Sequence, residues 1–158
     1  MPSPCQNHGP PILVGGGGKR ILSAAGRCAD IVTIAGSTVG ELARLPDRAA
    51  LAERVRWVAS SADSAGRSPE LHILLAAVIV TSDRRSAARQ FMANWPVSSV
   101  PPPDENDVLA SPFVAIGSEQ QIAAQLLRQR EEFGISFISV RSAAAPAMAA
   151  VIEVLTGS

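Results

Sequence analysis

The chain has 158 residues, of which 47% are hydrophobic and 18% are charged. This composition suits one folded domain and excludes an intrinsically disordered chain. Fourteen Lys and Arg residues balance fourteen Asp and Glu residues, and this net charge of zero argues against a nucleic-acid partner. The longest apolar run, residues 71–80, is about half of what a bilayer crossing needs. Residues 1–10 lack the basic and apolar regions of a signal peptide. These features predict a cytoplasmic globular protein with no membrane partner.

The chain begins with a proline-rich stretch, residues 1–10, which predicts an irregular lead-in to one domain over residues 11–158. Residues 12–14 are apolar and predict a short strand that runs into four consecutive glycines. Apolar residues at helical spacing predict a helix over 21–28, and the β-branched run 30–34 predicts a second strand. Cys5 and Cys28 lack the spacing of a disulfide framework or a metal site. Cys28 lies among alanines and is predicted to be a buried, unreactive thiol.

In the middle of the chain, Pro46-Asp47 predicts the start of a helix whose apolar face continues to Val58. The nearly unbroken apolar run 71–80 predicts a single strand covered on both faces, as in parallel sheets. A helix is predicted from Ser82 or Asp83 to Asn94. Residues 97–112 contain three consecutive prolines and predict a long loop.

The last third of the chain repeats the alternation. Ser118 and Gln121 form a capping box that starts a helix, and Gly134 ends it. Residues 135–140 predict a strand, and a final helix is predicted over 146–155. Strands that alternate with helices form right-handed βαβ units, so the predicted fold class is α/β with a parallel sheet.

The glycines Gly15 to Gly18 lie between a predicted strand and a predicted helix, which is the geometry of an anion site. Glycine lets the backbone approach a phosphate closely, and the first N–H groups of the helix point toward it. Lys19 and Arg20 would add positive charge there. A flexible strand-to-helix turn explains the same glycines without a ligand.

The glycine cluster departs from the common nucleotide-binding motifs. A P-loop requires Gly-Lys-Ser/Thr, and here Arg20 follows Lys19. A dinucleotide-binding pattern through Gly15 and Gly17 would have Arg20 in place of its third glycine. The second strand also has no clear ribose-binding acid at its end. A small nucleotide-binding domain is therefore the weaker alternative.

Three other polar residues are candidates with smaller roles. His72 starts a predicted buried strand and is expected to be a structural group with hydrogen-bond partners. Asp30 precedes its strand, at the edge that stabilises barrels, whereas Arg141 follows the last strand, at the edge where ligands collect. An ordinary surface arginine is the other interpretation of Arg141. Because these pieces assemble no Ser-His-Asp set, Cys-His set or carboxylate pair, the sequence predicts no catalytic residue and no metal ligand.

Several stretches resemble the C-terminal portion of luciferase-like oxidoreductases, and most closely the branch that uses a deazaflavin coenzyme. The similar stretches, in chain order, are Pro10–Arg20 (PPILVGGGGKR), Ala24–Val32 (AAGRCADIV), Arg54–Val58 (RVRWV), Ser118–Ile122 (SEQQI) and Phe133–Ile138 (FGISFI). The resemblance covers roughly Pro10 to Gly157, nearly the whole chain.

The resemblance implies a luciferase-like (β/α)8 TIM barrel and an oxidoreductase of the monooxygenase type. It also implies a cofactor, coenzyme F420 (a deazaflavin) or FMN, and a small-molecule substrate at the carboxyl ends of the strands. In that family the glycine loop contacts the cofactor phosphate. The resemblance therefore assigns cofactor binding to Gly16, Gly17, Gly18 and Arg20.

The chain is shorter than the family pattern. A complete (β/α)8 barrel needs about 250 residues, so this sequence predicts a partial barrel, its C-terminal half. The family's catalytic residues lie in the other half, which no segment here matches. A half barrel has open strand edges and one uncovered sheet face, which predicts a homodimer or pairing with a complementary barrel half. The alternative is a non-catalytic remnant or assembly subunit that keeps the fold.

Overall fold

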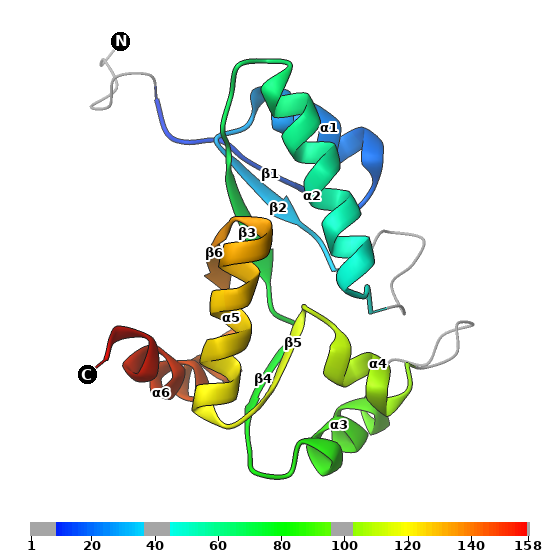
Figure 1. The fold of residues 1–158 in the computed structure, drawn as a ribbon, viewed down its shortest axis with the longest axis vertical. Helices are drawn as coiled ribbons and strands as arrows, with labels where there is room; N and C mark the ends of the chain where they lie inside the picture. Colours follow the sequence, from blue (N-terminus) through cyan, green and yellow to red (C-terminus); the bar gives the residue numbers. More distant parts are fainter. Residues whose placement is uncertain (1–8, 37–44, 96–102, 158) are drawn as a thin grey trace.

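The computed structural model describes residues 9–36, 45–95 and 103–157. This part of the chain contains six strands and six α-helices, which alternate except that β4 follows β3 and α4 follows α3 directly (Figure 1). The elements are β1 (Leu13–Gly16), α1 (Lys19–Cys28), β2 (Ile31–Ile34), α2 (Arg48–Asp63), β3 (Glu70–Leu74), β4 (Ala77–Val80), α3 (Arg84–Ala93), α4 (Glu105–Ala110), β5 (Val114–Gly117), α5 (Glu119–Phe133), β6 (Ile135–Ser139), a 3₁₀ turn η1 (Ser142–Ala144) and α6 (Ala145–Thr156).

The strands form two parallel sheets. The larger has the order β1-β2-β3-β6, and β4 pairs with β5 in the smaller. Because every pairing is parallel, the carboxyl ends of β1, β2, β3 and β6 lie at the same edge of the sheet. The predicted α/β class with parallel βα units is confirmed.

The apolar run 71–80 is two strands, and the prediction of a single one is wrong. The run breaks where its hydrogen-bond partner changes. The N–H of Leu75 donates to Ser139 O at 3.0 Å, beside β6, whereas the N–H of Ala76 donates to Phe113 O at 2.7 Å, beside β5. One apolar run therefore supplies strands to both sheets, and side-chain hydrophobicity alone carries no sign of that exchange.

The loop predicted over residues 97–112 is also partly wrong, because its described end contains helix α4. Asp104 caps the helix by accepting the N–H of Asp107 at 2.8 Å, and the Asp107 carboxylate accepts the N–H of Asp104 at 3.2 Å. Asp104 and Asp107 thus form a capping box, which starts a helix directly after the prolines. Residues 97–102 lie outside the described part of the chain.

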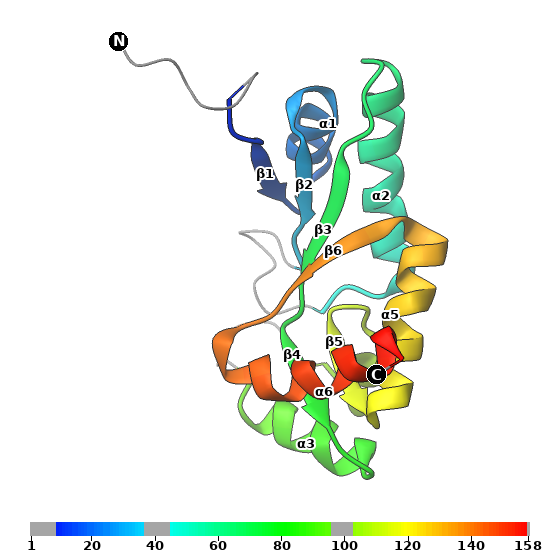
Figure 2. The same cartoon turned by 90° about the vertical axis from the view of Figure 1, so that its left-hand side faces the viewer.

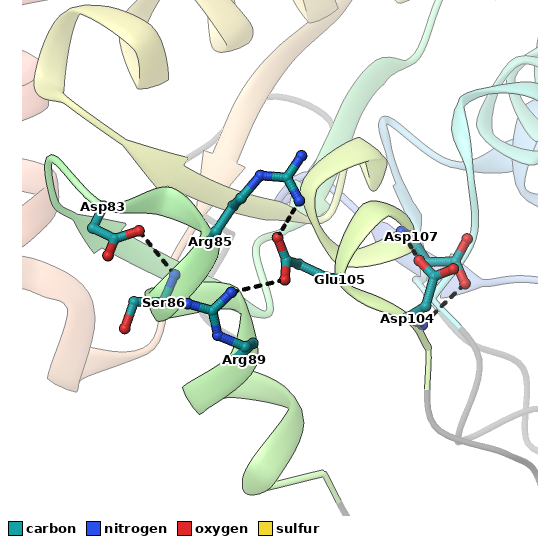
Figure 3. Close-up of polar contacts among 7 residues, drawn as sticks. All are labelled: Asp83, Arg85, Ser86, Arg89, Asp104, Glu105 and Asp107. Carbon is teal, nitrogen blue, oxygen red and sulfur yellow. Dashed lines mark hydrogen bonds and ion pairs between the residues drawn. The ribbon is translucent and has the colours of Figure 1, made fainter.

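Helices α3 and α4 are joined by charged contacts and by a small apolar core. Arg85 and Arg89 on α3 both donate to the Glu105 carboxylate on α4, at 2.7 and 3.0 Å (Figure 3). Beneath them the two helices and the smaller sheet share a second buried cluster, formed by Ala87, Ala88, Val108, Val114 and Ile116. This unit lies beyond the carboxyl edge of the larger sheet (Figure 1).

Helices cover one face of the larger sheet and leave the other face open. Val32, Ile34 and Ile73 are fully buried against the helices, in the same core as Leu22 of α1 and Leu51 of α2. The strands lie in front of α1 and α2 in Figure 2, so the opposite face is turned to the viewer. We call this side the open face; it carries Leu13, Thr33, His72, Leu74, Phe137 and Ser139. Leu13, Leu74 and Phe137 are 49%, 42% and 38% exposed there.

Cys28 contradicts its prediction, because this free cysteine is exposed rather than buried. It is the last residue of α1, and the buried positions of that helix are Leu22, Ala25 and Gly26. Its thiol hydrogen-bonds Ala24 O, one turn earlier, at 3.2 Å. The small neighbours in the sequence therefore did not indicate which side of the helix Cys28 occupies.

Candidate cofactor-binding site

The four residues predicted to bind a cofactor phosphate lie together where β1 meets α1. Gly16 is the last residue of β1, Gly17 and Gly18 form the connection, and Arg20 is the second residue of α1. Gly17 is buried, whereas Arg20 is exposed. The connection is at the carboxyl edge of the sheet, where ligands bind in open α/β folds.

The start of α1 has backbone donors and no carboxylate. Gly18 is the N-cap residue, no side chain caps the helix, and its first turn holds no acidic residue. The first N–H groups of a helix need acceptors, and an anion can supply them. The hydrogen bonds of the described backbone include none from the N–H groups of Lys19, Arg20 or Ile21.

The glycines of this connection have different roles. A Cβ on Gly16 would lie 2.5 Å from Cγ2 of Ile21, so a larger residue here would force the Ile21 side chain to move. A Cβ on Gly18 would meet no atom within 4 Å. Gly18 therefore borders open space beside the helix start.

Strand β2 ends beside the same connection. The N–H of Ala35 donates to Gly16 O at 2.8 Å, and Nη1 of Arg54 on α2 donates to Ala35 O at 2.7 Å. The Arg54 residue is only 7% exposed. A buried guanidinium thus holds the end of β2 against the glycine strand, which makes Arg54 a positioning residue for this edge.

A polar row crosses the open face through three neighbouring strands. Nδ1 of His72 lies 2.8 Å from the Thr33 hydroxyl, and Nε2 lies 2.8 Å from the Ser139 hydroxyl. A neutral imidazole has one N–H donor and one acceptor, and each hydroxyl takes the complementary role. His72 is thus buried with both ring nitrogens hydrogen-bonded, as predicted for a structural histidine.

Burial lowers the pKa of His72, and the negative charge of Glu70 opposes this shift without cancelling it. Desolvation disfavours the imidazolium, so the neutral ring is the stable form in the fold. The ring of Phe137 covers the imidazole, with centroids 4.4 Å apart and planes tilted by 46°.

Asp30 and Arg141 lie at opposite edges of the larger sheet. Asp30 has the structural role expected of it: it accepts the N–H of Ile12 and an Nη2–H of Arg67, both at 2.8 Å. The Ile12 N–H, together with the charge of Arg67, lowers the pKa of this carboxyl. Arg141 is exposed and follows β6 at the carboxyl edge, but no described contact tests whether it binds an anion.

Thr33, Ser139 and Arg54 also belong to this edge, although nothing in the sequence singled them out as candidates. The first two are hydroxyl residues inside otherwise apolar strands, at positions facing the same side as His72. That alternation is visible in the sequence, but the pairing of β3 with β6 is not. Among the residues that the structure describes, no three His, Cys, Asp or Glu side chains gather as a metal site. No helix in the described ranges is long and apolar enough to span a bilayer.

The sequence matches no protein-family profile and no curated protein. Its fold, however, is similar to many solved structures. EDTA monooxygenase from Chelativorans sp. BNC1 superimposes with a TM-score of 0.63 at 14% identity, over 98% of this chain and 46% of that one. A riboflavin lyase solved with modified FMN and riboflavin has a TM-score of 0.62 at 14% identity, over 92% and 42%. The coenzyme F420-dependent tetrahydromethanopterin reductase from Methanopyrus kandleri has a TM-score of 0.57 at 14% identity, over 90% and 48%.

These similarities define the class of fold. The chain has a partial luciferase-like α/β fold with parallel strands, as predicted from its sequence motifs. It spans less than half the length of each of the three structures.

Proposed function

We propose that Gly16, Gly17, Gly18 and Arg20 bind the phosphate of a flavin-type cofactor, FMN or coenzyme F420, in an oxidoreductase of the luciferase-like class. The observation that carries this proposal is the start of α1, where Gly18 borders open space and no side chain caps the helix. Two neighbours of similar fold support the choice of cofactor, since one is F420-dependent and another contains modified FMN. The bound cofactor would supply hydride transfer to or from a small-molecule substrate.

The site residues have separate tasks in this proposal. Backbone N–H groups at the start of α1 donate to the phosphate, and the helix dipole favours its negative charge. Arg20 adds an exposed guanidinium, which forms stronger, charge-assisted hydrogen bonds. Arg54 holds the end of β2 beside Gly16 through Ala35 and so positions the connection.

Comparison of FMN with riboflavin tests the phosphate contact, because the two differ only in that group. We expect FMN to bind more tightly than riboflavin in a fluorescence titration, and Gly18→Asp to remove the difference. An aspartate is a good N-cap and its Cβ meets no neighbour, so this variant should keep its fold while repelling the phosphate. Gly18→Ala is the matched uncharged control. The assignment would be refuted if the unmodified chain bound FMN and riboflavin equally, and if it also bound F420 no more tightly than F420 without its phosphate.

We further propose that the open face is covered in the active assembly by four more βα units, from a second copy or a complementary chain. Three apolar side chains are exposed on it, and similar structures are about twice as long as this chain. We expect concentration-dependent dimers in sedimentation experiments, weakened by Phe137→Glu. Leu127→Glu, at an exposed apolar position on α5, is the control. A monomer at all concentrations, alone and with candidate partners, would contradict this proposal.

The same short span favours a second candidate, an assembly subunit that retains the fold without turnover. Both candidates share the assembly on the open face. They differ in turnover: the oxidoreductase changes the redox state of its bound cofactor, and the assembly subunit does not. Absorbance of the flavin or deazaflavin measures this change directly. Turnover that depends on Gly18 favours the oxidoreductase.

A further inference from the structure

A groove of about 460 Å³ lies between α1 and α2, on the helix side of the sheet. One wall is a stripe of α1 with Lys19, Ser23 and Arg27 at successive turns. The other is a stripe of α2, formed by Arg56, Trp57, Ser60, Ser61 and Ser64. The two helices are brought together at Gly26, where a Cβ would lie 2.6 Å from Val58 O.

The groove gathers positive charge without compensation. Lys19, Arg27 and Arg56 all line it, and none of its lining residues is acidic. In the described part of the chain none of the three has an ion pair, whereas Arg48, Arg67, Arg85 and Arg89 are paired with carboxylates. Three positive side chains without a carboxylate partner make the groove a favourable place for a bound anion.

The remaining lining residues suit an anion with several acceptor atoms. Ser61 and Ser64 donate their hydroxyls to carbonyls of α2, at 2.8 Å to Trp57 O and to Ser60 O. Ser23 and Ser60 also line the groove, and among the described residues their hydroxyls have no such partner, so both can donate to a bound anion. Trp57 packs partly against the main core and forms a rigid wall.

We propose that this groove binds a small linear polyanion that carries two or more phosphate or carboxylate groups. Lys19 and Arg27 are eight residues apart on one helix, which corresponds to about 12 Å along its axis. An extended ligand can contact both of these cations and also Arg56 across the groove, whereas a single compact anion cannot. The groove should therefore bind the extended ligand more tightly. The proposal goes beyond the cofactor site, because it concerns the flank of α1 that faces α2 and rests on Arg27 and Arg56, which lie outside the glycine connection.

Trp57 provides a direct readout. The chain has two tryptophans, so Trp95→Phe leaves Trp57 as the only one. We expect tripolyphosphate, added at low ionic strength, to change its fluorescence saturably, with orthophosphate at least tenfold weaker. Citrate serves as the carboxylate probe, and whichever of the two polyanions binds more tightly identifies the preferred anionic group.

Charge-neutral variants locate the site. Arg27→Gln and Arg56→Gln should each weaken tripolyphosphate binding about tenfold, since each removes a charge-assisted hydrogen-bond donor. Arg128→Gln on α5 removes the same charge from an exposed position outside the groove and should leave binding unchanged. Equal weakening by all three variants, or no saturable binding by calorimetry of the unmodified chain, would overturn the proposal.

Discussion

Nε2 of His72 on β3 lies 2.8 Å from the Ser139 hydroxyl on β6, although 67 residues separate them in the sequence. This contact, together with the Thr33 hydroxyl on the other side of the ring, joins β2, β3 and β6 across the open face. The buried imidazole is neutral in the fold, so its protonation is coupled to stability.

Acid should therefore destabilise the chain through His72. The folded pKa is lowered, so below about pH 6.5 the unfolded state takes up a proton that the folded state resists, and stability falls as the pH drops. The loss cannot exceed about 1.4 kcal/mol per pH unit for one proton. Urea unfolding at pH 7 and pH 5 measures it. His72→Gln, which does not titrate, should show a smaller loss, and an equal loss would contradict the assignment.

Gly26→Ala should destabilise the packing of α1 on α2. The new Cβ would lie 2.6 Å from the backbone carbonyl of Val58 and 2.5 Å from the Ser61 hydroxyl. We expect a loss of about 1–3 kcal/mol in chemical unfolding, although helix propensity favours alanine by about 1 kcal/mol. Gly18→Ala, whose Cβ meets no atom, should cost no more than about 1 kcal/mol. Combining Gly26→Ala with Ser61→Ala should restore only part of the loss, since Val58 O cannot move aside.

Asp30 fixes the chain that enters β1. It accepts the Ile12 N–H on one oxygen and Arg67 on the other. Asp30→Asn keeps an acceptor for Ile12, so it should lower the melting temperature less than Asp30→Ala does. Because the folded pKa of Asp30 is lowered, its charge stabilises the fold above about pH 3.8 and stops doing so as the pH falls through the folded pKa. The difference between the wild type and Asp30→Asn should thus shrink in acid. A constant difference would show that the charge is not involved.

Glu105 should contribute little, despite its two arginine partners in Figure 3. The side chains of Arg85 and Arg89 are 68% and 57% exposed, so water screens both pairs. Glu105→Gln should cost less than about 1 kcal/mol at low salt, and less still at high salt. Glu131→Gln, an exposed position on α5, is the control for loss of a carboxylate. A large, salt-independent loss would mean that Glu105 acts through packing.

The sequence determined the features that depend on neighbouring residues. Glycines between a strand and a helix indicated the connection at Gly16–Gly18, and the capping box at Ser118 and Gln121 fixed the start of α5. The alternation of apolar strands with helices was enough to predict parallel βα units, because local periodicity and the handedness of the crossover leave few other arrangements. The motifs also indicated the luciferase-like fold, with about half of its length.

Only the tertiary structure decided the features that depend on pairing. The break at Leu75 and Ala76 arises because two different strands supply the backbone acceptors on either side of it. The row of Thr33, His72 and Ser139 requires β2, β3 and β6 to be neighbours, and the groove of unpaired cations requires α1 to meet α2 at Gly26. The physical reason is common to all three: hydrogen bonds and charges act over a few ångströms in space, whatever the separation along the chain.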